Sequence, residues 1–324
     1  MGMLMDGKWT DQRPTPVAGR FVRPESQFRG RITADGSSGF KAEAGRYHLY
    51  VAYNCPWAHR TIIFRKLKGL ENIVSMAVAV PNDRAQGWAF HDGFPGATPD
   101  TVNGFRYLHE AYTAAKADYT GTVTVPTLWD CKTRTIVNNE SPEIIRMFNS
   151  AFDAIGATPG DYYPAALRAQ IDEVNEFVYT HINNGVYRTG FAVTQEAYDE
   201  SVQRVFAGLD SMEQRLSVQR YLAGDVITEA DWRLFVTLVR FDAVYQHLFK
   251  CTLRPLASYP SLHNYLLDLY QVPGVAGTVR LDHIVAGYYA IDRVNPNGII
   301  PKIAALDFTR PHDRTRIKAA RTAA

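Results

Sequence analysis

The chain has 324 residues, of which 46% are hydrophobic and 21% charged, a composition typical of a globular protein long enough for two domains. Its formal net charge is +2, so charge gives no reason to expect nucleic acid as a partner. No stretch approaches the ~20 consecutive apolar residues of a membrane-spanning helix, and the first residues lack the apolar run of a signal peptide, which predicts no membrane partner. A short basic cluster from Arg310 to Arg321 is interpreted as a solvated C-terminus. Three widely spaced cysteines, Cys55, Cys131 and Cys251, predict free thiols and a cytoplasmic protein.

Residues 1–45 are rich in Gly, Pro, Arg and Ser and show no sustained period, which predicts an extended arm and regular structure only after it. Residues 46–53 (RYHLYVAY) alternate and carry aromatic and β-branched side chains, which predicts a strand. A helical pattern follows between Pro56 and Gly69, and residues 73–80 (IVSMAVAV) predict a second strand. Strand, helix and strand in this order form the βαβ unit of a parallel sheet.

A long insertion at residues 82–121 comes next, with one predicted helix at 105–117. Insertions of this length are uncommon unless they are functional. Residues 123–130 and 134–139 then predict a hairpin pair of strands, and a helix opens at Glu140. The order βαβ followed by ββα is that of a thioredoxin-like domain.

The predicted fold class is therefore α/β plus all-α, with a thioredoxin-like domain at 46–150 and a helical domain at 151–290. The helices expected in the second domain cover residues 165–183, 194–218, 228–249 and 260–271. The third has a complete start signal, because Thr228 and Asp231 have the spacing of a capping box. The last fifty residues are rich in Gly and Pro and predict an irregular segment, of which 291–324 form the C-terminal tail.

Cys55 is the strongest candidate for chemistry. It lies just ahead of a predicted helix, where unpaired N–H groups and the helix dipole stabilise a thiolate and lower the pKa of cysteines to roughly 3.5–7.5. Thioredoxin-type motifs place a second cysteine three residues on, but this chain has Ala58 there. A mixed disulfide on Cys55 must therefore be cleared by a thiol from solution, which in the cytoplasm is glutathione. Cys131 and Cys251 are expected to be inert.

Two dipeptides support a glutathione site. Pro126 follows Val125 inside a predicted strand, which requires a cis bond or a turn, and a cis-proline beside the cysteine of a thioredoxin-like fold leaves main-chain groups free for a thiol peptide. Ser141 can cap the next helix while Glu140 accepts from an ammonium group, an arrangement that fits the γ-glutamyl end of glutathione. An ordinary edge-strand proline and a plain helix cap are the structural alternatives. No Cys/His pairs lie at zinc spacing, so no metal is expected.

Three segments closely resemble the glutathionyl-hydroquinone reductases, the Xi class of glutathione transferases. They are residues 53–60 (YNCPWAHR), 125–130 (VPTLWD) and 136–141 (IVNNES), and shorter similar segments lie at 183–187, 239–242 and 295–299. The resemblance runs from about Trp9 to Pro301. It implies a homodimeric, glutathione-dependent oxidoreductase that reduces glutathionyl-hydroquinones to hydroquinones through a mixed disulfide on Cys55, which a second glutathione resolves.

The resemblance also implies individual roles. Tyr187 resembles the proton donor or acceptor of the family, while Tyr245 and Tyr288 resemble hydroxyls that help to lower the pKa of the thiolate. The implied glutathione contacts are Trp88, Thr122, Val123, Thr124, Val125, Pro126, Glu140 and Ser141. Family members often carry a basic residue at the position of Thr122, so one charged contact is missing here or is supplied elsewhere.

Three other functions stay open at the level of sequence. An omega-like thiol transferase would use the same thiol to reduce dehydroascorbate or to deglutathionylate proteins, although aromatic hydroxyls in the helical domain favour a quinone-sized substrate. A conjugating transferase needs a hydroxyl to support the thiolate of glutathione, whereas Cys55 would tend to form a disulfide with it. A non-catalytic scaffold of the same fold would be favoured by loss of that cysteine, which is present.

Overall fold

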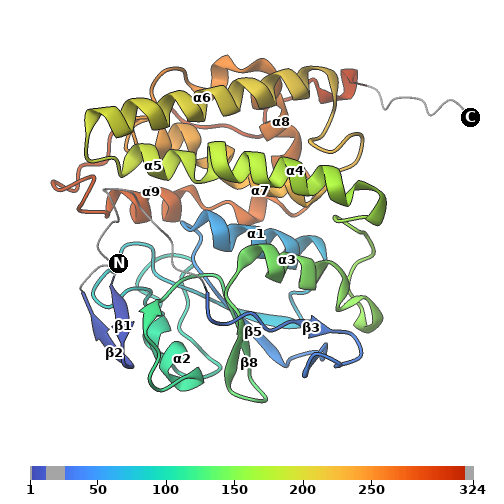
Figure 1. Cartoon of the computed structure of the whole chain (residues 1–324), viewed down its shortest axis with the longest axis vertical. Coiled ribbons are helices and arrows are strands. Elements are labelled where there is room, and N and C mark those ends of the chain that lie inside the picture. The colour runs from blue at the N-terminus through green and yellow to red at the C-terminus, as the bar shows by residue number, and fades with distance from the viewer. Residues whose placement is uncertain (1, 12–25, 318–324) are drawn as a thin grey trace, which may run out of the picture. The chain divides into compact units, whose positions relative to one another are not determined.

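The computed structural model describes residues 2–11 and 26–317, which form two compact units (Figure 1). Unit 1 runs to Gly160 and also includes Asp282–Gly287, whereas unit 2 comprises Asp161–Leu281 and the chain from Tyr288 onward. A mixed sheet with helices in unit 1 and a helical unit 2 confirm the predicted fold class. The finer domain limits given above stay predictions.

A four-stranded sheet forms the core of unit 1. Its strands, in order across the sheet, are β6 (Val74–Val78), β5 (Tyr47–Val51), β8 (Thr127–Asp130) and β9 (Thr135–Asn138). β5 is parallel to β6 and antiparallel to β8, which in turn pairs antiparallel with β9. Every residue of β5 is buried, which explains why its sequence carries so many aromatic and β-branched side chains.

Two helices of unit 1 pack against each other on one side of this sheet. α1 (Pro56–Leu67) and α3 (Ser141–Ser150) lie together in Figure 1 and are in contact along their length. Both begin with a proline in their first turn, where the missing N–H costs no hydrogen bond. The βαβ and ββα order predicted from the sequence is therefore confirmed.

The insertion at 82–121 contains one helix, α2 (Leu108–Ala115), shorter at both ends than the 105–117 predicted. Its loop is organised around the buried carboxylate of Asp100. That carboxylate accepts hydrogen bonds from the main-chain N–H groups of Val102, Asn103 and Phe105 and from the hydroxyl of Tyr50. The part of the insertion before α2 is thus held in place partly by one buried carboxylate.

The prediction that regular structure begins only near residue 46 is wrong. β1 (Met3–Met5) pairs with β2 (Lys8–Thr10) and with β7 (Gly121–Thr122), while β3 (Ile32–Thr33) runs parallel to β4 (Phe40–Lys41). Strands of two or three residues are too short to show a period of two, which is why the sequence pattern missed them. Residues 12–25 of the predicted arm lie outside the described residues.

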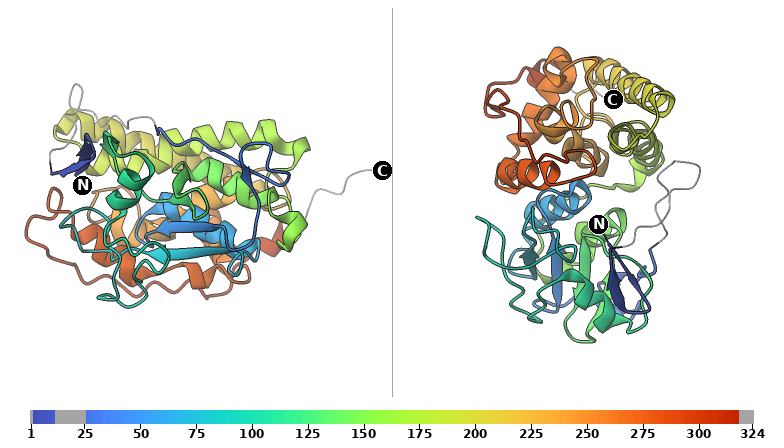
Figure 2. Two further views of the ribbon diagram at one scale, coloured as in Figure 1. Left: turned by 90° about the horizontal axis from the view of Figure 1, so that it is seen from below. Right: turned by 90° about the vertical axis from the view of Figure 1, so that its left-hand side faces the viewer.

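Unit 2 is a bundle of helices. Its main helices are α4 (Arg168–Val178), α5 (Gly185–Gly190), α6 (Gln195–Val218), α7 (Glu229–Arg240) and α8 (Pro260–Tyr270). α6 packs on α5 and α8, and α7 packs on α4 and α8 (Figure 2). Two predicted helices end in a π-helical turn, α4 in η3 (Tyr179–Asn183) and α7 in η4 (Phe241–Tyr245).

The segment predicted to be irregular after residue 275 contains α9 (Leu281–Tyr289). Gly287 lowers the helix signal of that sequence, but the packing of unit 1 requires a glycine there, because a Cβ at this position would lie 2.3 Å from Nδ2 of Asn54. The residues beyond α9 contain only one short 3₁₀ turn, η7 (Arg314–Arg316), within the described part of the tail.

The basic cluster near the C-terminus is not simply a solvated tail. Arg314 is fully buried, and its guanidinium donates to the carbonyl oxygens of Leu216, Gln219 and Arg220 at the C-terminal end of α6, at 2.6–2.7 Å. The interpretation of the cluster as solvated is therefore wrong for Arg314, because these carbonyls have no partner within the helix and attract a buried donor. Arg321, at the end of the same cluster, lies outside the described residues.

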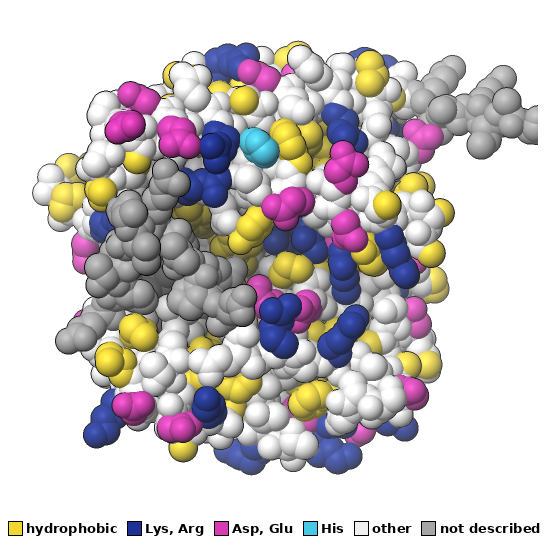
Figure 3. Space-filling view, in the orientation of Figure 1, with side chains coloured by type: hydrophobic (Ala, Val, Ile, Leu, Met, Phe, Trp, Pro, Cys, Tyr) yellow, Lys and Arg dark blue, Asp and Glu magenta, His cyan; other side chains and the backbone are white. Residues whose placement is uncertain are grey.

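Lys, Arg, Asp and Glu side chains are interspersed on the face seen in Figure 3, with no continuous basic stripe on that face. None of the helices within residues 2–11 and 26–317 is both long and apolar enough to cross a membrane.

Candidate active site

Cys55 is the N-cap residue of α1, as the sequence predicts. Its extended backbone (φ −80°, ψ 119°) turns the chain into the helix, and its carbonyl accepts the hydrogen bond of His59 N–H at 3.0 Å. The side chain is partly exposed, and Sγ lies 3.5 Å from the carbonyl oxygen of Val125. The Val125–Pro126 peptide bond is cis, one of the two conformations that the sequence left open. The structure thus brings Cys55 and the Val125–Pro126 dipeptide together in unit 1.

The other two cysteines have different environments. Cys251 is completely buried, and burial raises the pKa of its thiol to about 12. Burial and the neighbouring carboxylate of Asp130 also raise the pKa of Cys131, which is partly buried at the end of β8. Since only thiolates are good nucleophiles, both groups are poorly suited to chemistry near neutral pH.

A hydroxyl of the insertion holds the segment in front of Pro126. The Tyr112 hydroxyl donates to the carbonyl oxygen of Thr124 at 3.0 Å and accepts from the Thr124 N–H at 3.3 Å. Asn139 donates its side-chain N–H to the same hydroxyl at 3.0 Å. The sequence alone does not indicate Tyr112 or Asn139, because nothing in a sequence shows that a helix of the insertion meets the start of β8.

The two residues before Thr124 are held by other parts of unit 1. Thr122 belongs to β7 and pairs with Met3 of β1, and the Tyr119 hydroxyl donates to its carbonyl oxygen at 3.2 Å. Val123 is buried, whereas the side chains of Thr122 and Thr124 are partly exposed. The N-terminal hairpin therefore supports the segment that sequence resemblance assigns to glutathione.

Glu140 and Ser141 lie at the start of α3. Glu140 is the N-cap residue, its N–H donates to Oδ1 of Asn138 at 2.7 Å, and its carboxylate accepts from the hydroxyl of Ser26. The prediction that Ser141 caps the helix is wrong, because Ser141 is already the first helical residue and its side chain forms no cap. Pro142 explains this shift, since its fixed φ and missing N–H suit the first turn of a helix.

Trp88 is almost fully buried in the insertion. Its main-chain carbonyl oxygen accepts from the N–H of Leu108 at 2.9 Å, which ties it to the start of α2. Within the described residues its indole N–H has no acceptor. A buried donor without an acceptor costs roughly 1–3 kcal/mol, so an acceptor on a ligand would be stabilising there.

Three tyrosine hydroxyls meet in unit 2. Tyr187 comes from α5, Tyr245 from η4 and Tyr288 from α9. The Tyr288 oxygen lies 2.5 Å from that of Tyr187 and 2.9 Å from that of Tyr245. Burial, together with Tyr245, raises the pKa of Tyr288 well above its ordinary value, so Tyr288 stays a neutral donor.

Aromatic packing fixes the three rings. The ring of Phe249 lies 5.4–5.7 Å from the ring centroids of Tyr187, Tyr245 and Tyr288. Phe249 itself packs closely on Gly190, where a Cβ would lie 2.2 Å from the phenyl ring. We call these three tyrosines the tyrosine cluster; its hydroxyls can pass a proton along a chain of short hydrogen bonds.

Two protein-family models match the chain. The N-terminal domain of glutathione S-transferase matches residues 54–151, and the C-terminal domain of the same family matches residues 195–267. A cysteine at the first helix of a thioredoxin-like unit and a helical second unit are thus the two parts of a glutathione transferase.

Full-length relatives narrow this class. Glutathionyl-hydroquinone reductase YqjG of Escherichia coli K12 is 51% identical, over 97% of this chain and 98% of its own length. Glutathionyl-hydroquinone reductase PcpF of Sphingobium chlorophenolicum is 51% identical, over 93% of this chain and 96% of its own. The chain therefore belongs to the glutathionyl-hydroquinone reductases, the Xi class of the glutathione transferases.

Solved structures agree with this assignment. The glutathione-bound structure of YqjG has a TM-score of 0.90 and 50% identity, and covers 97% of this chain and 99% of YqjG. A Xi-class glutathione transferase from Natrialba magadii has a TM-score of 0.92 and 46% identity, over 98% of this chain and 97% of its own. Among residues 2–11 and 26–317, no group of three or more His, Cys, Asp or Glu side chains is placed to hold a metal ion.

Proposed function

We propose that this chain reduces glutathionyl-hydroquinones to hydroquinones, with glutathione as the reductant. The observation that carries the proposal is the position of Cys55, a partly exposed thiol at the start of α1 beside the carbonyl of Val125. No second cysteine lies within reach of it in the motif, since Ala58 is at the resolving position. The membership of the chain in its family, described above, supports the same activity.

The first step transfers the glutathionyl group to the enzyme. Direct attack of a thiolate on the sulfur of an aryl thioether would expel an aryl carbanion, which is too unstable to leave. In the keto tautomer of the hydroquinone the carbon that bears sulfur is no longer aromatic, so the leaving group is an enolate. The Cys55 sulfur then bonds to the glutathione sulfur, the carbon–sulfur bond breaks, and protonation of the enolate oxygen gives the hydroquinone.

The second step restores the thiol. A second glutathione attacks the mixed disulfide, oxidised glutathione leaves, and Cys55 is released as a thiolate. The sum converts one glutathionyl-hydroquinone and one glutathione into one hydroquinone and one oxidised glutathione. Because the enzyme alternates between two covalent states, we expect ping-pong kinetics.

We propose that the tyrosine cluster handles the protons of the first step. Tyr187 is its partly exposed member and is the candidate to donate to, or accept from, a ring oxygen of the substrate. Tyr288 and Tyr245, both buried, would supply and stabilise that proton through the short hydrogen bonds between them. Disulfide exchange alone needs no such group.

Glutathione itself would be bound by unit 1. In this proposal Glu140 accepts from the γ-glutamyl ammonium group, and Ser141 at the start of α3 lies where free N–H groups can receive the carboxylate. Thr122 to Pro126 would pair with the tripeptide main chain, and the indole N–H of Trp88 would find its missing acceptor.

Product analysis tests the proposed activity against that of an omega-like thiol transferase. The protein is mixed with glutathione and a panel of glutathionyl-hydroquinones, and separately with dehydroascorbate. We expect hydroquinone and oxidised glutathione in equal amounts, with dehydroascorbate turned over far more slowly. Efficient reduction of dehydroascorbate without hydroquinone release would contradict the proposal.

We also propose a homodimer in the cytoplasm. The dimer rests on the resemblance to the Xi class, and the compartment is supported by three cysteines, all of them free thiols. Light scattering after size-exclusion chromatography should give twice the mass of 36.4 kDa.

A further inference from the structure

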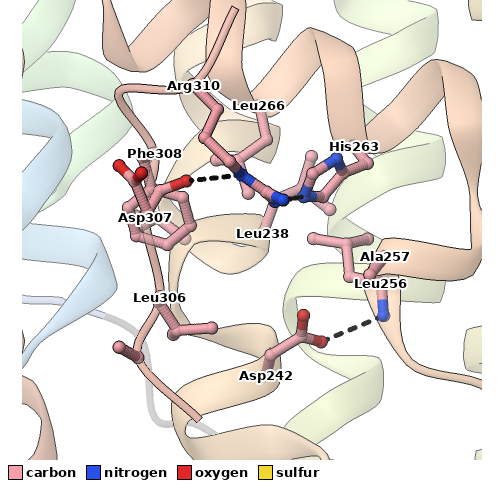
Figure 4. Close-up of a pocket in the computed structure, with 12 residues that line it drawn as sticks. Leu238, Asp242, Leu256, Ala257, His263, Leu266, Leu306, Asp307, Phe308 and Arg310 are labelled. Atoms are coloured by element: carbon pink, nitrogen blue, oxygen red, sulfur yellow. Dashed lines mark hydrogen bonds between the residues drawn. The ribbon is translucent and has the colours of Figure 1, made fainter.

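A cavity of about 170 Å³ lies in unit 2 under the C-terminal segment 305–310 (Figure 4). Leu238, Leu256, Leu266 and Phe308 supply much of its apolar wall. For comparison, an engineered cavity of about 150 Å³ holds one benzene molecule, so this space fits a ligand of about six non-hydrogen atoms. Nothing in the proposed chemistry uses it.

Two acidic residues line this cavity, Asp242 of η4 and Asp307, whose carboxylate accepts from the N–H and hydroxyl of Thr309. Oδ1 of Asp242 accepts from the N–H of Leu256 at 3.0 Å, the one hydrogen bond of this side chain within residues 2–11 and 26–317. Burial raises the pKa of the carboxyl, whereas the Leu256 N–H and the imidazoles of His263 and His247 lower it. No Lys or Arg of the described residues forms an ion pair with Asp242.

Arg310 is the cation in the wall of the cavity, and it contacts other lining residues and not Asp242. The Arg310 guanidinium donates to the carbonyl oxygen of Asp307 and lies 3.3 Å from Nε2 of His263 (Figure 4). Burial and Arg310 together lower the pKa of His263, so this imidazole is neutral at pH 7. An apolar cavity with a carboxylate that lacks a cationic partner favours a ligand with one positive charge and a short hydrocarbon body.

We propose that this cavity binds a small primary alkylammonium ion, whose ammonium group pairs with Asp242 and whose chain contacts Leu238, Leu266 and Phe308. An anion of the same length would be repelled by the Asp242 carboxylate. A neutral analogue would leave that carboxylate without a cationic partner, so neither should bind.

The position of Asp242 links such a ligand to the tyrosine cluster. Asp242 and Tyr245 belong to the same π-helical turn, η4, and Tyr245 lies 2.9 Å from the hydroxyl of Tyr288. π-Helical turns are rare and occur frequently at functional sites. A ligand bound to Asp242 therefore contacts the same turn that positions Tyr245, and we expect it to change turnover. This coupling rests on the proposed function.

Calorimetric titration of the full chain with n-butylammonium chloride tests the site. We expect one saturable site per chain, with no binding of sodium butyrate or 1-butanol. Asp242→Asn keeps the shape and the acceptor for Leu256 N–H but removes the charge, so affinity should fall at least tenfold. Asp199→Asn, at an exposed position of α6, is the matched control and should bind as the wild type does.

A second variant covers the case that Asp242→Asn does not fold. Ala257 lines the cavity yet is exposed, so Ala257→Trp fills the space from outside and should abolish binding. Equal binding of butylammonium and butyrate, or unchanged affinity in both variants, overturns the site.

Turnover measurements test the coupling separately. Saturating butylammonium should change the kcat of glutathionyl-hydroquinone reduction in the wild type but not in Asp242→Asn. Unchanged turnover in a wild type that binds the ion overturns the coupling. If no hydroquinone is released at all, the proposed function is wrong. The calorimetric titration still tests whether the cavity binds butylammonium, because it does not depend on turnover.

Discussion

The three cysteines of this chain show how position alone sets the reactivity of a residue. Cys55 is at the start of a helix with its sulfur partly exposed, whereas Cys131 and Cys251 have thiols whose pKa is raised by burial. All three are the same chemical group. Only Cys55 lies at the start of a helix with its sulfur partly exposed, and it is the cysteine that the sequence selects.

The first prediction is that Cys55 is the one thiol needed for turnover. Cys55→Ser should abolish reduction and leave the fold intact, because a serine hydroxyl cannot form the mixed disulfide. Cys131→Ser and Cys251→Ser should keep activity. Intact-mass analysis with oxidised glutathione should show one adduct, mapped to Cys55 by peptide digestion, and an adduct mainly on either other cysteine would contradict the assignment.

A second prediction concerns the hydroxyl of Tyr187. Tyr187→Phe keeps the ring packed on Phe249 and removes the proton donor, so glutathionyl-hydroquinone turnover should fall by ~10²–10⁴-fold. Reduction of a simple mixed disulfide on Cys55 should hardly change. Both rates are measured on one preparation, and equal losses would mean that Tyr187 serves packing and takes no part in proton transfer.

At the scale of single elements, the start of α3 illustrates a local arrangement that the sequence gives only in part. Glu140 and Ser141 lie at a helix start as the sequence predicts, but the N-cap position belongs to Glu140 and not to Ser141. The partners that hold them could not be predicted, because Ser26 is more than a hundred positions away and its contact depends on the path of the chain.

The third prediction is that Glu140 governs the affinity for glutathione. Glu140→Gln leaves the ligand ammonium without a charged partner, a loss of roughly 1.5–3 kcal/mol, or about 10–150-fold in affinity. The KM for glutathione should rise with little change in kcat. Glu143→Gln is the matched control on the same helix, since Glu143 pairs with Arg29. Unchanged binding of glutathione to Glu140→Gln in calorimetry would remove Glu140 from the site.

α7 carries the fourth prediction. The capping box predicted from Thr228 and Asp231 is confirmed, and the buried Asp231 carboxylate also accepts from Leu222 N–H and the Tyr265 hydroxyl. Asp231→Ala leaves these donors without an acceptor and should lower the free energy of unfolding by about 3 kcal/mol or more. Urea unfolding measures the loss, and Asp199→Ala on the exposed face of α6 should stay within about 0.5 kcal/mol of the wild type.

Elements whose own sequence has a strong strand or helix pattern were predicted. Elements that depend on tertiary contacts were not. β5 and β6 have apolar runs, and α6 is preceded by Thr194, whose side chain caps the helix. The short helix α5 lies between two glycines, and α9 contains one, so their propensity is low. Both exist because tertiary packing overrides propensity, as the close approach of Gly190 to Phe249 shows.

At the scale of the whole molecule, a buried histidine should set the acid stability. His48 lies on β5 with 1% of its surface exposed, and its Nδ1 is 2.7 Å from the hydroxyl oxygen of Ser75. Burial lowers the pKa of His48 to about 4, opposed by Asp100 and assisted by Arg65. The folded protein therefore keeps a neutral imidazole at pH values where the unfolded chain is protonated.

The fifth prediction follows from the sign of that shift. Since the folded pKa is below the unfolded value of about 6.5, the stabilisation is present above pH 6.5 and is lost as the pH falls toward 4, by up to about 3 kcal/mol. Urea unfolding at pH 7 and at pH 4.5 should show this loss in the wild type. His48→Gln should show a smaller loss and the exposed His247→Gln the same loss as the wild type; equal losses in all three would exclude His48 as the cause.

The buried guanidinium of Arg314 binds the end of a helix that is synthesised well before Arg314 itself. It donates to three carbonyls at the C-terminal end of α6, almost a hundred positions earlier in the chain. Ribosomes add about 5–20 residues per second, so Arg314 is synthesised roughly 5–20 s after these carbonyls. During translation the C-terminal end of α6 therefore stays open to water until the segment that carries Arg314 has been made.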